Sequence, residues 1–360
     1  MNEHILTEIR NRLGVLTLNR PQALNSLSLD MVRAITHALL EWRDNDAIDA
    51  VLIDSSSDRA FCAGGDIRFF YQAGQWTPQQ GSALLDDFFT EEYALNHLIH
   101  HYPKPYIAFM DGIVMGGGMG IAQCHSAGKL RIVTERSKLA MPEVNIGLFP
   151  DVGGSYFVSR CPGQLGTWLA LTANPIGAAD ALHFGLADIF IPSEHLPALK
   201  ASLACTDHGD IGTHVREFAA QFDNQDISVL ALQRECIDRH FAFDDVPSIM
   251  ASLASDSTPF AQDTLSAMKK RSPLMLCVTL QQIRRGAHMS VEECLRMERS
   301  MMRHCFAHGE ALEGIRATVI DKDMRPAWSP ATLEEVSPQM VEAFFRPAWP
   351  HHAHPLRCWL

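Results

Sequence analysis

The chain has 360 residues, of which 47% are hydrophobic and 20% are charged, and its formal net charge is −12. A chain of this length and composition can bury a large core, and its excess of acidic residues argues against a nucleic-acid-binding surface. No apolar run reaches the eighteen or more residues of a membrane span, so we expect neither nucleic acid nor a membrane as a partner.

Cysteines and histidines form no metal-binding pattern in the sequence. Nine cysteines lie singly along the chain without a C-x-x-C pair, and the histidines within 351–354 lack the spacing and acidic support of a structured site. We therefore expect reduced thiols and no bound metal. The N-terminus runs into a strand pattern without a basic segment ahead of an apolar core, which favours a cytoplasmic location.

Strands and helices alternate over the first part of the chain. In chain order we expect a strand pair at 5–10 and 13–18, a helix at about 29–43, a buried strand at 50–53, a crossover helix at 83–100 and a buried strand at 106–110. This alternation predicts an α/β fold in which helices pack on a parallel sheet.

Beyond residue 191 the pattern becomes mainly helical. We therefore expect a catalytic core at 1–200, a helical region at 201–345 and a tail at 346–360. For the tail the sequence favours a disordered end.

Two glycine-rich loops follow the two buried strands, Phe61–Asp66 after the first and Asp111–Gly120 after the second. Right-handed crossovers would bring both loops to one edge of the sheet. Two backbone N–H groups there can donate hydrogen bonds to one oxygen atom. The second loop lacks the Lys-Ser/Thr ending of a phosphate loop and the G-x-G-x-x-G spacing of a dinucleotide site. For either loop alone a structural role stays open, in which glycine lets a helix start pack tightly on the sheet.

Two carboxylates, Glu143 and Asp151, follow the second loop. If both side chains line one small pocket, they should titrate as a coupled pair with at least one pKa raised. Asp151 could also cap the helix that follows it. A Ser-His-Asp triad from Ser126, His125 and Asp111 is disfavoured, because adjacent residues on one backbone rarely face each other and no G-x-S-x-G turn is present.

In order and spacing, the two loops resemble the enoyl-CoA hydratase/isomerase, or crotonase, superfamily over about residues 5–191. Segment 141–154, MPEVNIGLFPDVGG, is similar to the signature of the 3-hydroxyisobutyryl-CoA hydrolase subfamily. Residues 88–93, 271–273 and 313–317 are similar to other characteristic segments of that subfamily. The resemblance implies a crotonase-like ββα superhelix core with an appended, mainly helical C-terminal region. It also implies an acyl-CoA substrate and raises the expectation of a homo-oligomer.

Residue by residue, the resemblance places the oxyanion hole on the backbone N–H groups of Gly65 and Gly117, and Glu92 in the acyl pocket. The alternative for Glu92 is an ordinary surface glutamate. Coenzyme A would enter as part of the substrate, so we expect no separate cofactor. The residues that the resemblance places along coenzyme A are Ala23, Leu24, Ser26, Ala63, Gly64, Gly65, Asp66 and Ile67.

The residue at position 120 favours one reaction over another. Hydration of a carbon–carbon double bond in this superfamily usually employs two glutamates, and the first of those positions is Gly120 in this chain. Glycine cannot deliver or accept a proton, so hydrolysis of the thioester is favoured. Glu143 would then activate water or attack the carbonyl carbon itself, with Asp151 assisting. We expect Glu92, Gly117, Glu143 and Asp151 to contact the substrate.

The expected substrate is a short 3-hydroxyacyl-CoA, above all 3-hydroxyisobutyryl-CoA from valine breakdown. Two alternatives stay open at this point: an enoyl-CoA hydratase or isomerase, and a non-catalytic acyl-CoA-binding protein.

Overall fold

The computed structural model describes residues 3–76, 81–123, 128–205, 210–222 and 227–359, so His125 and Ser126 lie outside the described residues. The chain divides into two compact units, each assembled from three separate stretches. The first, which we call the sheet unit, comprises Met1–Gly65, Leu95–Ala140 and Ile176–Ala231; the second, the helical unit, comprises Asp66–Ala94, Met141–Pro175 and Leu232–Leu360. The expected division at residues 200 and 345 stays a prediction.

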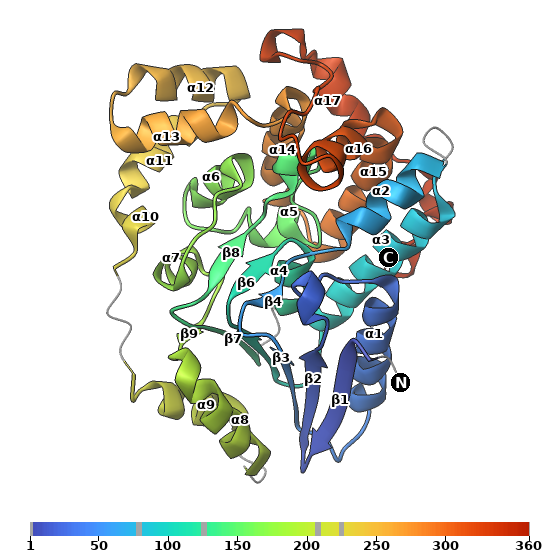
Figure 1. Ribbon diagram of the computed structural model, residues 1–360, viewed down its shortest axis with the longest axis vertical. Coiled ribbons are helices and arrows are strands. Elements are labelled where there is room, and N and C mark those ends of the chain that lie inside the picture. The colour runs from blue at the N-terminus through green and yellow to red at the C-terminus, as the bar shows by residue number, and fades with distance from the viewer. Residues whose placement is uncertain (1–2, 77–80, 124–127, 206–209, 223–226, 360) are drawn as a thin grey trace. The chain divides into compact units, whose positions relative to one another are not determined.

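A sheet of six strands forms the centre of the sheet unit (Figure 1). Its strands, in spatial order, are β1 (Ile5–Arg10), β2 (Leu13–Leu18), β3 (Ala50–Ser55), β5 (Tyr106–Met110), β7 (Lys129–Val133) and β9 (Ile189–Phe190). Only β1 and β2 pair antiparallel, and the others pair parallel. The α/β alternation that the sequence predicts is therefore confirmed.

A second, smaller sheet carries the glycine-rich loops. It consists of β4 (Ala60–Cys62), β6 (Ile113–Met115) and β8 (Lys138–Ala140), all parallel. The sequence predicts that the loops follow β3 and β5 directly, and this detail is wrong. Strands of three residues are too short to show the alternation of side chains by which a strand is recognised.

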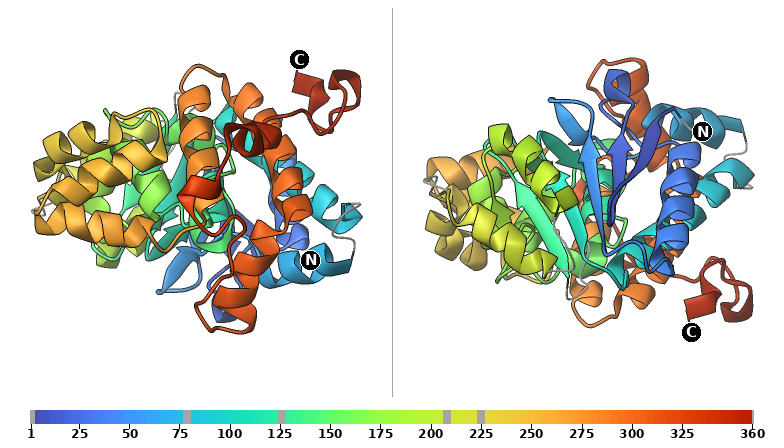
Figure 2. Two further views of the ribbon diagram at one scale, coloured as in Figure 1. Left: turned by 90° about the horizontal axis from the view of Figure 1, so that it is seen from above. Right: turned by 90° about the horizontal axis from the view of Figure 1, so that it is seen from below.

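Helices cover both faces of the six-stranded sheet. On one face α8 (Leu196–Cys205) and α9 (Ile211–Ala219) pack on strand residues such as Val15, Leu52 and Ile132. The right view of Figure 2 draws these two helices, in yellow-green, beside the sheet. Since side chains alternate along β2, Gly14, which precedes Val15, faces the opposite side, towards Trp42 of α1 (Leu29–Arg43). A Cβ atom on Gly14 would lie 2.5 Å from the Trp42 ring.

The sheet unit contains further short helices. These are η1 (Pro21–Ala23), α4 (Gly117–Ala122), α7 (Ala178–Phe184), η3 (Ser193–His195) and α10 (Val229–Leu232), of which α10 ends in the helical unit. The long helix α3 (Ala83–His100) begins in the helical unit and ends in the sheet unit.

Helices make up most of the helical unit. In chain order they are α2 (Ile67–Trp76), η2 (Glu143–Ile146), α5 (Gly154–Phe157), α6 (Leu165–Thr172), α11 (Arg234–Phe241), α12 (Val246–Ser255), α13 (Pro259–Met268), α14 (Pro273–Gly286), α15 (Val291–His308), α16 (Glu310–Ile315), the π-turn η4 (Arg316–Ile320), η5 (Leu333–Glu335) and α17 (Pro338–Phe344). The local sequence explains where several of them begin: Thr258, Ser272 and Ser337 each cap a helix that starts with proline.

Residues 346–359 of the tail adopt defined local structure, contrary to the expectation of a disordered end. This segment contains two short 3₁₀ turns, η6 (His351–Ala353) and η7 (Arg357–Trp359), and the side chain of His354 is buried against the carbonyl oxygen of Arg296. Among the described helices, none is long and apolar enough to cross a lipid bilayer.

Candidate functional site

The two glycine-rich loops lie side by side in the sheet unit. Strands β4 and β6 are paired, and Gly64, at φ +106°, lies so close to the second loop that a Cβ atom there would be 3.2 Å from the carbonyl oxygen of Met115. The same Cβ would be 3.7 Å from the backbone nitrogen of Gly117. The expected convergence of the loops is therefore present.

Neither Gly65 nor Gly117 donates its backbone N–H to an acceptor within the described part of the chain. Gly117 is the first residue of α4, where helical N–H groups have no partner inside the helix. Two N–H groups of this kind are the donors that an oxyanion hole requires. Which ligand they bind stays a prediction.

The residues assigned to coenzyme A in the sheet unit form two hydrogen-bonded stretches. Ala63 donates its N–H to the carbonyl oxygen of Leu24 at 3.0 Å, and Leu27 donates to that of Gly64 at 2.8 Å. Ala23 and Ser26 flank this contact on the same loop. The remaining two residues assigned to coenzyme A, Asp66 and Ile67, lie at the start of α2 in the helical unit.

Asn25 is a site-forming residue that sequence reasoning missed. It is buried at φ +55°, and its side-chain nitrogen donates to the carbonyl oxygens of Ala60 and Phe61 at 3.1 and 3.0 Å. Its side-chain oxygen accepts the N–H of Arg20 at 2.7 Å. Asn25 thus ties the 20–27 loop to β4, and asparagine is one of the few residues that tolerates positive φ.

The predicted carboxylates come together in the helical unit. Glu92 on α3, Glu143 at the start of η2, and Asp151 just before α5 have exposed fractions of 2%, 6% and 6%. One oxygen of Asp151 accepts a hydrogen bond from the hydroxyl of Tyr93 at 2.7 Å. Glu92 is therefore not an ordinary surface glutamate, the alternative that the sequence left open.

Two oxygens of this group have no hydrogen-bond partner among the described residues. They are Oε1 of Glu92 and Oε2 of Glu143, both buried. A buried polar atom without a partner costs free energy, so its persistence at a site points to a ligand or a catalytic role. These two oxygens are candidates for contact with a bound substrate.

Burial raises the pKa of all three carboxyl groups. It raises the pKa of Asp151 to about 7, although the hydrogen bond from Tyr93 opposes the shift. Burial and then the charge of Asp151 raise the pKa values of Glu143 and Glu92 well above the ordinary glutamate value. At neutral pH the group therefore carries fewer negative charges than it has carboxyls, and protons can move onto and off it.

Glu298 on α15 also belongs to this region, and the sequence analysis did not single it out. Its buried carboxylate accepts the backbone N–H groups of Gly153 and Ser155, each at 2.8 Å. Glu298 occupies the apolar face of α15, three residues after Leu295 and three before Met301, which are both buried. A charged residue at such a position is a signal that the sequence did contain.

The capping role that the sequence left open for Asp151 is not what the structure shows. Helix α5 starts after Gly153, which offers no side chain, and Glu298 takes up two of the backbone N–H groups there. The carboxylate of Asp151 is engaged by Tyr93 instead.

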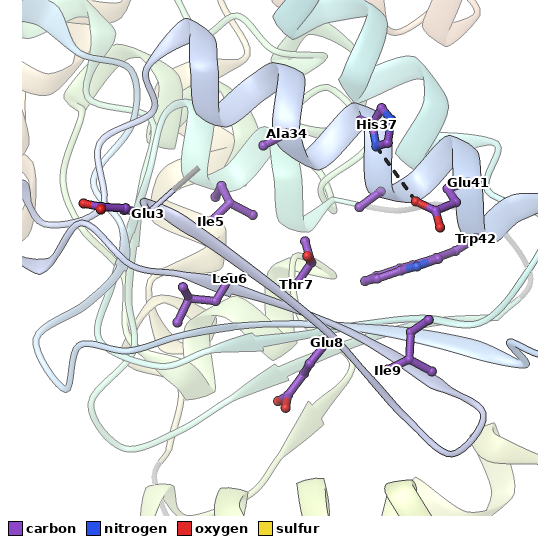
Figure 3. A pocket seen from close by; sticks show the side chains of 11 residues that line it. Glu3, Ile5, Leu6, Thr7, Glu8, Ile9, Ala34, His37, Glu41 and Trp42 are labelled. Atoms are coloured by element: carbon purple, nitrogen blue, oxygen red, sulfur yellow. Dashed lines mark ion pairs between the residues drawn. The ribbon is translucent and has the colours of Figure 1, made fainter. Parts of the chain in front are cut away.

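A surface groove of about 570 Å³ lies between β1 and α1 (Figure 3). Leu6, Ile9 and Trp42 line it, and a contact of 3.9 Å between His37 and Glu41 marks its rim. None of the predicted site residues lines this groove.

Cys236, His240 and Asp256 bring three ligand-type atoms within 4.8 Å of one another. Asp256 already accepts a hydrogen bond from Arg239 at 2.6 Å and lies 3.0 Å from Nε2 of His240. Because a cationic side chain already holds the carboxylate, the cluster gives no ground for a metal, and the expectation of no metal stays a prediction.

The paired glycine loops on a small parallel sheet, beside a larger parallel sheet with helical additions, define a protein of the crotonase fold. Two solved structures share it over nearly the full chain. A carnitinyl-CoA dehydratase from Mycobacterium thermoresistibile aligns with a TM-score of 0.89 and 39% identity, covering 97% of this chain and 98% of that one. An enoyl-CoA hydratase from Rhodobacter sphaeroides 2.4.1 aligns at 0.86 and 37%, covering 96% and 98%.

Sequence comparison identifies the family of the chain and also its subfamily. The model of the enoyl-CoA hydratase/isomerase family matches residues 13–345. The mitochondrial 3-hydroxyisobutyryl-CoA hydrolase of Danio rerio is 41% identical over 346 residues, covering 95% of this chain and 89% of the relative. The protein of the same name in Homo sapiens is 36% identical over 349 residues, covering 96% and 89%. The chain therefore belongs to the enoyl-CoA hydratase/isomerase family, in its 3-hydroxyisobutyryl-CoA hydrolase subfamily.

The expectation of a cytoplasmic location is wrong by this comparison. The relatives from Danio rerio, Xenopus tropicalis and Homo sapiens are all named as mitochondrial proteins. The expectation rested only on the lack of a leader pattern, and such a lack carries no information about location.

Proposed function

We propose that the protein hydrolyses a short 3-hydroxyacyl-CoA thioester, 3-hydroxyisobutyryl-CoA, to the free acid and coenzyme A. The names of the relatives support this substrate. In this proposal coenzyme A enters as part of the substrate, and no separate cofactor takes part.

The observation that carries the proposal is the buried group of Glu143, Asp151 and Glu92, in which Oε2 of Glu143 has no partner among the described residues. A carboxylate held in a dry, acid-rich environment is more basic than one in water, because its charged form is disfavoured. The deprotonated form of Glu143 is therefore a stronger base towards water than an exposed glutamate.

Two routes remain for Glu143. In the first it removes a proton from water while the water oxygen bonds to the thioester carbon, the carbon–sulfur bond breaks, and the proton passes to the coenzyme A thiolate. In the second its own oxygen attacks that carbon, coenzyme A leaves as the thiolate, and water then opens the mixed anhydride. We assign Asp151 and Glu92 to orienting the water or the substrate hydroxyl.

The backbone N–H groups of Gly65 and Gly117 would stabilise the negative oxygen that develops on the thioester in either route. One such donor contributes about 2.7 to 4 kcal/mol to transition-state stability. A side chain at either position would restrict the approach of the carbonyl group to the backbone.

Hydration of an enoyl-CoA is the second candidate, and the names of the two similar structures favour it. Residue 120 argues against it. Gly120 lies buried within α4 and has no acidic side chain to donate or accept a proton, whereas hydratases of the superfamily that the sequence resembles usually carry a glutamate at this position.

Release of free thiol from 3-hydroxyisobutyryl-CoA by the purified protein tests the proposal. We expect turnover with this thioester and no loss of enoyl absorbance with crotonyl-CoA. No thiol release, or a faster loss of crotonyl-CoA, would show that the assignment is wrong. Binding of acyl-CoA without turnover of any thioester would instead indicate a non-catalytic binding protein.

The variant Glu143→Gln tests the role of Glu143 in the reaction. It keeps the size of the side chain but removes the base, so we expect turnover to fall by about 10²-fold or more while substrate binding stays close to wild type. Binding is measured by calorimetry with a non-hydrolysable thioether analogue. Wild-type turnover in this variant would remove Glu143 from the mechanism.

A homo-oligomer is a further proposal. Light scattering of the purified protein measures the mass of the particle and tests it directly.

A further inference from the structure

The turn that carries Asp151 is held in an unfavourable backbone conformation. Val152 has φ +54° and Gly153 has φ +86°, and the N–H of Gly154 donates to the carbonyl oxygen of Asp151 at 2.7 Å. A β-branched residue at positive φ is costly, so contacts elsewhere must stabilise this conformation.

Two side chains from the C-terminal helices supply those contacts. Glu298 of α15 accepts the N–H groups of Gly153 and Ser155 at 2.8 Å, one on each carboxylate oxygen. Gln282 of α14 donates from its side-chain nitrogen to the carbonyl oxygen of Pro150 and, at 2.7 Å, to the hydroxyl of Ser155. The backbone on both sides of Asp151 is therefore bonded to residues more than 120 positions away.

We propose that Glu298 is a positioning residue for the reaction: through the N–H groups of Gly153 and Ser155 it holds the turn in which Asp151 meets Tyr93. The inference rests on the proposed function, because it assumes that Asp151 takes part in thioester hydrolysis. No catalytic contact is assigned to Glu298, whose two oxygens are both occupied by backbone donors.

Besides holding the turn by hydrogen bonds, Glu298 affects the neighbouring groups through its charge. Titratable groups that interact with it come from several elements: Tyr93 from α3, Glu143 from η2, Asp151 from the turn, and Cys294 from α15 itself. After burial and the charge of Asp151, the charge of Glu298 is a further cause that raises the pKa of Glu143. Removing that charge should lower the pKa of Glu143.

The variant Glu298→Gln tests both effects. An amide offers one oxygen where the turn needs two acceptors, so the turn loses a hydrogen bond and the neighbouring carboxyls lose a negative charge. We expect kcat to fall by about tenfold or more while KM stays within about twofold. We also expect the acidic limb of the pH profile of kcat to move to lower pH.

Glu310→Gln serves as the matched control. Glu310 is also a buried glutamate of the helical unit with two hydrogen-bond partners, Ser272 and the N–H of Ser329. Within the described part of the chain, no hydrogen bond joins its carboxylate to the Asp151 turn. The variant Glu310→Gln should lower thermal stability without moving the acidic limb of the pH profile of kcat. The shorter variant Glu298→Asp keeps the charge, so its acidic limb should stay nearer to that of the wild type while its kcat falls.

A wild-type kcat and acidic limb in Glu298→Gln would overturn the proposal, and so would equal changes in Glu310→Gln. A second measurement does not depend on the substrate: hydrogen exchange of the Gly153 and Ser155 amides should become faster in Glu298→Gln, and ¹³C NMR should report a lower pKa for the Glu143 carboxyl. Failure of wild-type turnover would contradict the proposed function, whereas unchanged exchange and titration would contradict the role of Glu298.

Discussion

Tyr93 is the one described side chain that donates a hydrogen bond to Asp151, and the two residues come from segments 58 positions apart. The bond stabilises the charged form of Asp151 against the desolvation that raises its pKa to about 7. At the scale of single residues, the charge state of the site near neutral pH therefore depends on a phenol as well as on the carboxyls.

The variant Tyr93→Phe should raise the pKa of Asp151 above 7, because it removes only the hydroxyl that favours the carboxylate. If the charged form of Asp151 is needed, activity at pH 7 falls by roughly sevenfold to eightyfold and recovers at higher pH, since a hydrogen bond to a charged group is worth about 1.5–3 kcal/mol. The pH profile of thiol release measures this. Tyr102→Phe, which removes a hydroxyl bonded to the carbonyl oxygen of Leu39, should leave the profile unchanged.

At the scale of elements, the start of α4 can reach β4 only because residue 118 has no side chain. A Cβ atom on Gly118 would lie 2.3 Å from the carbonyl oxygen of Cys62, which is backbone and cannot rotate away. This close approach holds the two glycine loops together. The structural role that the sequence left open for glycine thus applies to Gly118, and it positions the N–H of Gly117.

Gly118→Ala should therefore cost about 1–3 kcal/mol of unfolding free energy, and more if the backbone cannot shift. Gly177→Ala is the comparison, because no atom lies within 4 Å of a Cβ there and its φ is −87°. At that helix N-cap the exchange should cost less than about 1 kcal/mol. Urea unfolding of both variants measures the difference, and equal stability would contradict the packing argument.

At the scale of the whole molecule, the buried acids make stability depend on pH. Burial raises the pKa of Asp151 to about 7 and that of Glu298 to about 8. A group whose pKa is higher in the folded state stabilises the fold below its unfolded pKa, and this contribution is lost as pH rises through its folded pKa. Asp256 has the opposite sign, because hydrogen bonds, first of all from the backbone of Thr258, lower its pKa to about 2.

The free energy of unfolding should therefore be highest at about pH 4, where the contribution of Asp256 is nearly complete and those of Asp151 and Glu298 begin to decline. Between pH 5 and pH 8 we expect a fall of several kcal/mol, because each pKa unit corresponds to about 1.4 kcal/mol. Urea unfolding at several pH values measures it. The fall should be smaller in Glu298→Gln, and a stability that rises steadily to pH 8 would contradict this account.

Short-range patterns in the sequence were enough to predict several secondary-structure elements and several candidate site residues. The bounds of β1, β2, α1, α3 and β5 match the expected ranges, because each of these elements is long enough to show either a period or an unbroken run of apolar residues. Gly65, Gly117, Glu143 and Asp151 were found from local motifs and from the family resemblance, which the comparisons confirm. Their roles in the reaction stay predictions.

The small sheet, the hydrogen bonds of Asn25 and the contacts of Tyr93 and Glu298 could be found only from the tertiary structure. Strands of three residues carry no readable period, and a side-chain contact between Glu298 and Gly153 spans 145 positions. The charge state of the carboxyls also depends on burial, which belongs to the folded chain. The sequence by itself therefore determined which acids and glycines are present, and the fold decided which of them share protons and what holds them in place.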